Sequence, residues 1–205
     1  MSKLYSNNDH PITNIRHTSF KDVKSVKKTL KLISKRSIIY QKSLINTLYN
    51  RAIYHPNKTD DMRKAIRLMK KWLIKNKHKK YKYEYLDLIT IKFFEKLANK
   101  YDISRVARGL DKPSKTQYGF LVMYKKYGKG KLPFIPIFKN TPERGDYDIY
   151  REKYLNARLA QMKKMKIKLY DDNRLPTKHH LTLIMNGYSP DKNITKKIKQ
   201  KWFSI

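Results

Sequence analysis

The sequence predicts an all-α fold built from several helices, and three observations lead to it. Apolar residues recur at intervals of three and four over most of the chain, as on one face of a helix. Segments that alternate apolar with polar residues are nearly absent. Capping residues, glycines and prolines stand where the periodic stretches begin and end. We expect a flexible arm at residues 1–20, a basic helical region at 21–101 and a compact helical domain at 102–205.

Four helices are expected in the basic region: from Asp22, from Ile38 to Ile53, from Thr59, and from about Tyr83 to Lys100. Thr59 suits a helix N-cap, since the two aspartates after it fall in the first turn, where negative charge is favourable. The buried face of the fourth helix is predicted to comprise Leu86, Ile89, Phe93 and Leu97.

After Tyr101 prolines and glycines become frequent, which predicts shorter helices and longer loops. The expected helices are Ile103 to Arg108, about Gln117 to Tyr127, Asp146 to about Lys166, one opened by Pro176-Thr177, and one begun by Ser189-Pro190-Asp191. The stretch from Gly128 to Gly145 should be a loop, because its prolines are incompatible with a central strand.

The charge balance is the most informative feature for function. The chain has 49 Lys and Arg against 16 Asp and Glu, a formal net charge of +33. Like charges repel one another in a compact state, and a polyanion relieves that repulsion. Apolar residues at 40% and aromatic residues at 12% exclude a disordered basic tail. A folded domain that binds nucleic acid is therefore indicated.

Other features exclude several protein classes. The lack of cysteine argues against a disulfide scaffold and a Cys-ligated zinc site. No apolar run approaches the length of a membrane helix, and the N-terminus lacks the apolar core of a signal peptide. We expect a soluble intracellular or intravirion protein without a cofactor or a metal.

Residue usage indicates an AT-rich genome. Phe, Tyr, Met, Ile, Asn and Lys, which have AT-rich codons, are abundant, and Lys outnumbers Arg 38 to 11. Part of the lysine excess is therefore mutational. The scarcity of acidic residues is not explained by such a bias, so the functional interpretation of the charge stands.

Basic residues interleaved with tyrosine could bind phosphates while the rings stack on bases. Any one such cluster could equally be a solvated helix face, whereas the lack of acidic counterweights favours binding for the chain as a whole. The candidate binding residues are Arg63, Lys64, Arg67, Lys70, Lys71, Lys79, Lys80, Lys82, Arg105, Arg108, Lys125, Lys126, Lys129, Lys131, Arg151, Arg158, Lys178, His179 and His180.

No residue pattern predicts catalysis. The close carboxylate pairs stand at expected helix starts or turns, which explains them without a metal centre. Adjacent histidines on a helix point about 100° apart and so are poor ligands for one metal. The best candidates for a hidden site are Asp146, Asp148, His179 and His180, provided that the loop before Asp146 folds against the turn at Pro176. We expect a protein that is not an enzyme.

A resemblance covers about residues 103–191. The segments are Tyr150-Arg151-Glu152-Lys153-Tyr154-Leu155, Arg158-Leu159-Ala160-Gln161, and Pro176 to Pro190. They resemble an uncharacterised family of basic proteins from giant (nucleocytoplasmic large) DNA viruses. The family pattern has a Trp-Ala pair before the final tyrosine, where this chain has Asn186-Gly187. The resemblance implies a viral origin and no mechanism.

The expected function is that of a non-enzymatic, nucleic-acid-binding structural protein of viral DNA packaging or of the virion core. It would lie in the virion, the host cytoplasm or a viral factory. An RNA-embedded ribosomal protein of an AT-rich organelle such as the mitochondrion is one alternative. A minor capsid or scaffold protein with mainly protein partners is another.

Overall fold

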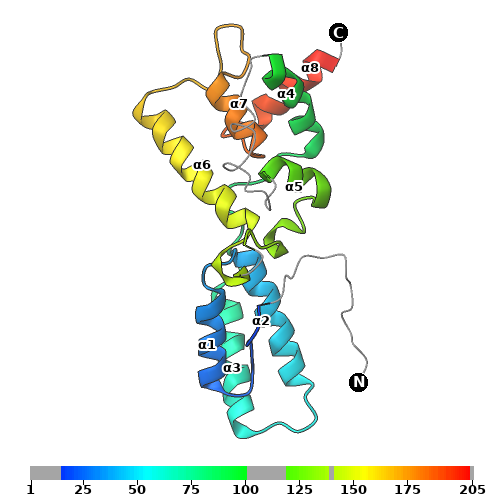
Figure 1. The fold of residues 1–205 in the computed structure, drawn as a ribbon, viewed down its shortest axis with the longest axis vertical. Coiled ribbons are helices and arrows are strands. Elements are labelled where there is room, and N and C mark those ends of the chain that lie inside the picture. Colours follow the sequence, from blue (N-terminus) through cyan, green and yellow to red (C-terminus); the bar gives the residue numbers. More distant parts are fainter. Residues whose placement is uncertain (1–14, 101–118, 139–140, 204–205) are drawn as a thin grey trace. The chain divides into compact units, whose positions relative to one another are not determined.

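The computed structural model describes residues 15–100, 119–138 and 141–203 of the 205-residue chain. Within these ranges the protein is all-α, as the sequence predicted (Figure 1). Its α-helices are α1 (Val23–Ile33), α2 (Ile38–Ile53), α3 (Asp60–Lys75), α4 (Leu88–Lys100), α5 (Phe120–Tyr127), α6 (Tyr147–Lys164), α7 (Lys178–Met185) and α8 (Lys192–Phe203). Two short 3-10 turns, η2 (Leu132–Phe134) and η3 (Pro142–Arg144), lie between α5 and α6. The expected helix at 103–108 lies outside the described residues, as does Gln117 itself. The helix expected from about Gln117 begins later, at Phe120, after the N-cap Gly119.

Side-chain caps begin several helices at the residues that the sequence indicated. Asp22, Thr59 and Thr177 each accept a hydrogen bond from the backbone amide three residues later, at 2.7, 3.2 and 3.4 Å. Each bond satisfies an amide that has no partner inside its helix. The predicted starts of α1, α3 and α7 are confirmed.

The start of α4 differs from the prediction. The helix begins at Leu88, because Asp87 caps it by accepting a hydrogen bond from the Thr90 amide at 2.7 Å. The predicted buried face was wrong as well: Ile89 is 66% exposed. The residues that α4 buries completely are Thr90, Ile91, Phe94 and Ala98.

The described residues belong to two compact units. The first is made from Met1–Tyr81 and Pro133–Ile149, and the second from Lys82–Leu132 and Tyr150–Ile205. The division therefore falls after Tyr81, not near residue 101 as expected, because α4 packs against α7 and α8 of the second unit. The first unit also recruits the stretch around η3, which is far away in the sequence.

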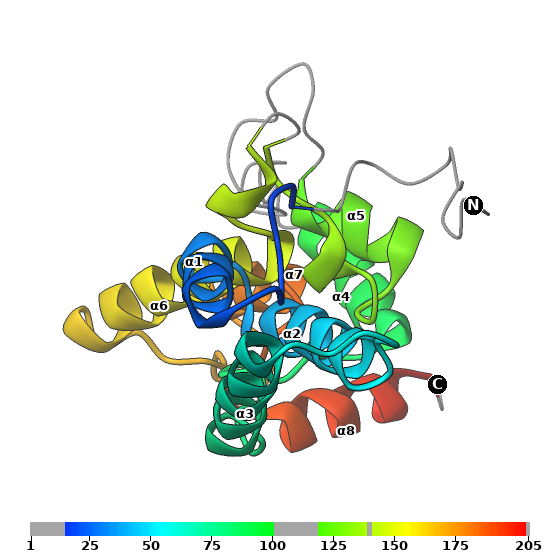
Figure 2. The ribbon, with the colours of Figure 1, turned by 90° about the horizontal axis from the view of Figure 1, so that it is seen from below.

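The core of the first unit is enclosed by α1, α2 and α3 (Figure 2). Both α1 and α2 pack against α3. The fully buried side chains at their centre are Val26, Ile33, Ile45, Ala52, Ala65 and Met69. Within each helix they are spaced by four or seven residues, which belongs to the helical period from which these helices were predicted.

Residues 15–20 differ from the flexible arm expected there. Ile15 is buried, and Phe20 packs against the same core. The Ser19 amide donates to Thr29 Oγ1 at 3.0 Å, which ties the segment to α1. The rest of the expected arm, residues 1–14, lies outside the described residues.

A buried ion pair joins the two stretches of the first unit. Arg36 Nε donates to Asp146 Oδ2 at 3.1 Å, and both side chains are fully buried. The other two guanidinium nitrogens, Nη1 and Nη2, donate to the carbonyls of Pro142 and Pro133 at 2.8 and 3.0 Å. Burial raises the pKa of Asp146, and the Ser37 amide and Arg36 oppose that rise. A buried arginine with this many acceptors is a structural anchor.

Candidate nucleic-acid interface

Helices α1 and α3 concentrate positive charge on the first unit. Between Ile15 and Tyr81 the chain has twenty Lys and Arg and three Asp. On α3 the predicted basic face is exposed as expected, and it comprises Arg63, Lys64, Arg67, Lys70 and Lys71. Because these residues are spaced by three and four, their side chains lie along one side of the helix.

The acidic residues of α3 neutralise little of this charge. Arg63 pairs with Asp60 at 2.6 Å and Lys64 with Asp61 at 3.3 Å. All four side chains are at least 59% exposed, so solvent screens both pairs and they contribute little. Within the described part of the chain, the cations further along the face have no carboxylate partner: Arg67, Lys70, Lys71 and Lys75.

Helix α1 adds a basic face that the list of candidates missed. Its four lysines are exposed, and the helix itself contains no acidic residue: Lys24, Lys27, Lys28 and Lys31. Since α1 packs directly against α3, both faces belong to one body. The signal was visible in the sequence as lysine without any acidic neighbour inside the helix.

The basic run after α3 is also exposed at Lys79, Lys80 and Lys82. Lys82 Nζ donates to Asn156 Oδ1 at 2.5 Å and lies 5.2 Å from the centroid of the Tyr83 ring. This tyrosine is partly buried and packs against the core of the second unit. Its ring is therefore not free to stack on a base.

The second unit presents its candidate cations in scattered places. Lys125 is paired with Glu95 at 2.6 Å, and Lys126 lies 5.1 Å from the Tyr127 ring centroid. Lys129, Lys131 and Lys178 are exposed, and His179 is half-buried. The half-buried Arg158 bonds Tyr154 and Gln161 on its own helix. Arg105 and Arg108 lie outside the described residues.

Arg151 requires a correction, since it is 2% exposed and cannot contact a phosphate. Its guanidinium donates to the carbonyls of Asn186, Gly187, Tyr83 and Glu84 at 2.8 to 3.1 Å. The group also lies 3.8 Å from the centroid of the Tyr85 ring. Arg151 therefore ties α6 to the ends of two other segments of the second unit.

His180 requires a correction too, since its side chain is fully buried. Its Nδ1 lies 3.0 Å from the Leu169 carbonyl and its Nε2 2.9 Å from Ser189 Oγ. Ser189 Oγ in turn lies 2.7 Å from Thr195 Oγ1. Burial lowers the pKa of His180 to about 4, although the Leu169 carbonyl and Asp191 oppose the change. The imidazole is a neutral core group.

Two of the residues considered for a hidden catalytic site, Asp146 and His180, are engaged in hydrogen bonds within their own units. Asp146 binds Arg36 and caps α6 through the Ile149 amide at 3.1 Å. Pro176 forms an isolated bridge with Tyr170 of the same unit. Over the described ranges, no cluster of three or more His, Asp or Glu side chains is placed to hold a metal ion. None of the helices in those ranges is long and apolar enough to span a membrane.

Neither a family model, nor a curated protein, nor a solved structure matches this chain. The resemblance to basic proteins of giant DNA viruses therefore stays a prediction from the sequence.

Proposed function

We propose that the protein is a non-enzymatic, nucleic-acid-binding structural protein that acts by neutralising phosphate charge. The observation that supports this proposal most strongly is the excess of positive charge on α1 and α3. Exposed lysines and arginines outnumber the carboxylates on these two helices. Phosphates provide the counter-charge that the protein itself lacks. Packaging of viral DNA is the proposed setting, supported by the AT-rich residue usage.

The binding energy should come mainly from counterion release, because we infer that the cations of α1 and α3 contact phosphates, which carry no sequence information. Binding is then tight at low salt and weakly dependent on sequence. If six or more phosphates are contacted, affinity falls on the order of a thousandfold between about 50 and 200 mM salt. Fluorescence anisotropy with a labelled duplex at several salt concentrations measures that slope.

The face of α3 gives a sharper test. Replacing Arg67, Lys70 and Lys71 by glutamine removes three cations without a carboxylate partner. Each lost phosphate contact lowers the slope of log affinity against log salt by about 0.9, so the triple variant should lose roughly 2.7. The matched control replaces Lys163, Lys164 and Lys168, which are exposed on the second unit, by glutamine.

The control variant should keep the wild-type slope. Equal losses in both variants would show that no face is preferred and that charge alone matters. A wild-type affinity that does not change with salt would refute binding through phosphates altogether.

A further inference from the structure

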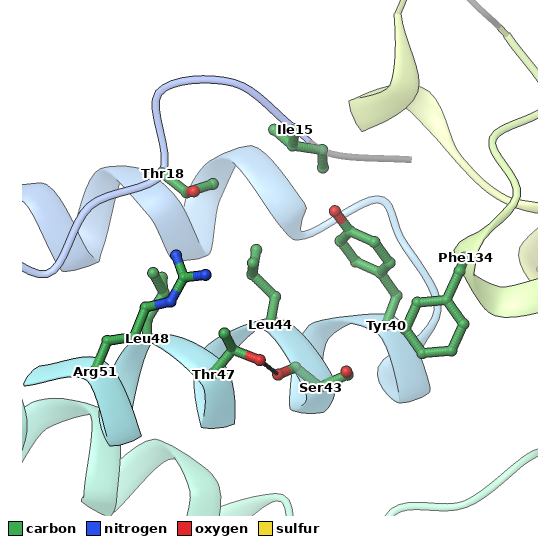
Figure 3. A pocket seen from close by; sticks show the side chains of 9 residues that line it. All are labelled: Ile15, Thr18, Tyr40, Ser43, Leu44, Thr47, Leu48, Arg51 and Phe134. Atoms are coloured by element: carbon green, nitrogen blue, oxygen red, sulfur yellow. Dashed lines mark hydrogen bonds between the residues drawn. The ribbon is translucent and has the colours of Figure 1, made fainter. Parts of the chain in front are cut away.

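A pocket of about 350 Å³ lies in the first unit, between α2 and the segment that precedes α1 (Figure 3). Its apolar wall consists of Ile15, Tyr40, Leu44, Leu48 and Phe134. The polar residues at its surface are Thr18, Ser43, Thr47 and Arg51. In Figure 3 the Arg51 guanidinium and the Phe134 ring stand at opposite ends, with Leu44 between them.

The walls of this pocket are held in place without a ligand. The Arg36 guanidinium lies 3.7 Å from the centroid of the Tyr40 ring, and Arg36 is itself fixed by the buried pair with Asp146. Opposite α2, the segment bearing Thr18 is anchored through Ser19 to Thr29. His17 has a φ of 63°, a left-handed conformation that is uncommon for a residue with a side chain. Such strain is found where a local shape is needed.

Three polar groups at the pocket have no partner within the described part of the chain. They are the hydroxyls of Thr18 and Ser43 and the guanidinium of Arg51. The Thr47 hydroxyl, by contrast, donates to the Ser43 carbonyl at 3.0 Å. An aromatic and aliphatic wall with a few free polar groups is the usual composition of a small-ligand site. An unpaired arginine at the rim adds a preference for an anion.

We propose that this pocket binds one unpaired nucleotide of a single-stranded nucleic acid. The base lies against the apolar wall, the two free hydroxyls bond its polar edge or its sugar, and Arg51 binds the phosphate. A base inside a duplex presents only its edges, so a concave wall of rings and leucines accepts an unstacked base. This inference rests on the proposed function and adds to it a preference for single strands.

The first test blocks the pocket without changing charge. Thr47 lines the pocket and is exposed on α2, so phenylalanine there should fill the space while the helix still folds. Asn46→Phe is the control, because Asn46 is exposed on the same helix but does not line the pocket. Thermal melting monitored by circular dichroism verifies that both variants are folded.

Affinities are measured by anisotropy for a labelled single strand and a labelled duplex of equal phosphate number. Thr47→Phe should lose roughly tenfold on the single strand, the size of one base-stacking contact, and nothing on the duplex. Asn46→Phe should match the wild type on both probes. Arg51→Gln should lower the affinity for the single strand more than Lys28→Gln does, although Lys28→Gln removes the same charge from α1.

A wild type that binds both probes equally, with no effect of Thr47→Phe, would overturn the pocket proposal and leave charge neutralisation intact. Failure to bind either probe would overturn both proposals. A labelled fatty-acid anion serves as the rival ligand. If it binds the wild type and not Thr47→Phe, while single-strand binding is unchanged, the pocket is an acyl site and the nucleotide proposal is wrong.

Discussion

His180 is a buried imidazole whose two ring nitrogens have opposite hydrogen-bonding roles. The Leu169 carbonyl can only accept, so Nδ1 carries the proton. Nε2 must then accept, and the Ser189 hydroxyl is placed to donate to it. Ser189 Oγ accepts in turn from the Asp191 amide at 3.1 Å. Protonating Nε2 would break this order, which is a second reason, besides burial, for the ring to stay neutral.

The protein should therefore become less stable as the pH is lowered through a defined window. In the unfolded chain His180 takes up a proton near its ordinary pKa of 6.5, whereas the folded protein resists until about 4. The contribution of the neutral His180 to the free energy of unfolding is fully present above pH 6.5. This contribution is lost as the pH falls toward 4, which lowers the free energy of unfolding by up to about 3 kcal/mol. Urea unfolding of the wild type and of His180→Gln at several pH values in this window measures the effect.

His180→Gln should be less stable at neutral pH but should lose less on acidification. His179→Gln is the control: His179 is half-buried, and this variant keeps the buried imidazole of His180, so it should show the wild-type pH dependence. Parallel curves for wild type and His180→Gln would show that the buried imidazole does not control acid stability.

The burial of Arg151 and His180 could not be predicted from neighbouring residues. Both belong to residue types that are mostly found at surfaces, and both stand beside charged or polar residues in the chain. What buries Arg151 is a set of carbonyls at residues 83–84 and 186–187, which only the tertiary fold brings together. Sequence periodicity indicates which side of a helix is apolar. It does not indicate which backbone carbonyls, distant in the sequence, the fold leaves without a hydrogen-bond donor.

Among the elements, α7 has an end whose hydrogen bonds and backbone conformation are fully described. The Tyr188 amide donates to the Leu183 carbonyl at 3.1 Å, and the Gly187 amide to that of Ile184 at 2.8 Å. These two bonds define a Schellman motif, in which the residue after the C-cap adopts a left-handed conformation. Gly187 has a φ of +71°, and Tyr188 packs with Leu183 in the same apolar cluster.

Gly187→Ala should destabilise the protein by about 1 kcal/mol, because a side chain disfavours this backbone conformation. A Cβ there would also contact the Phe120 ring at 3.4 Å. Gly130→Ala is the matched control, as its φ is not positive and a Cβ would meet nothing within 4 Å. Urea unfolding midpoints compare the two variants. Equal midpoints would mean that the end of α7 does not depend on glycine.

Helix ends set by residues three or four positions away were predictable, and those set by tertiary contacts were not. Asp22, Thr59 and Thr177 cap within their own first turns, so the sequence identifies them. The start expected at Tyr83 failed because the carbonyls of Tyr83 and Glu84 accept from Arg151 instead of continuing a helix. The pocket was equally hidden, since it joins Ile15 and α2 to Phe134.

For the molecule as a whole, a charge of +33 stores repulsion that a bound polyanion would release. A polyanion that binds the folded state should also stabilise it by mass action. Adding inorganic polyphosphate, which has no bases, should raise the melting temperature by roughly 5–10 °C at a hundredfold excess over its dissociation constant. Differential scanning fluorimetry measures this change, with neutral dextran as the control. A melting temperature unmoved by polyphosphate would show that repulsion does not limit stability.

The pair between Arg36 and Asp146 also constrains how the chain can mature during its synthesis. The two residues are 110 positions apart, so α1, α2 and α3 emerge from the ribosome long before the carboxylate that they require. Until then the guanidinium has neither Asp146 nor the carbonyls of Pro133 and Pro142 to bind, and it must remain in water. Closing this long loop is entropically costly and slow, so completion of the first unit waits until residues 82–132 of the second unit and the stretch that carries Asp146 have been translated. Until Asp146 is synthesised, the first unit of the nascent chain is incomplete. During that time its cationic helices are already exposed to the ribosomal RNA around the exit tunnel.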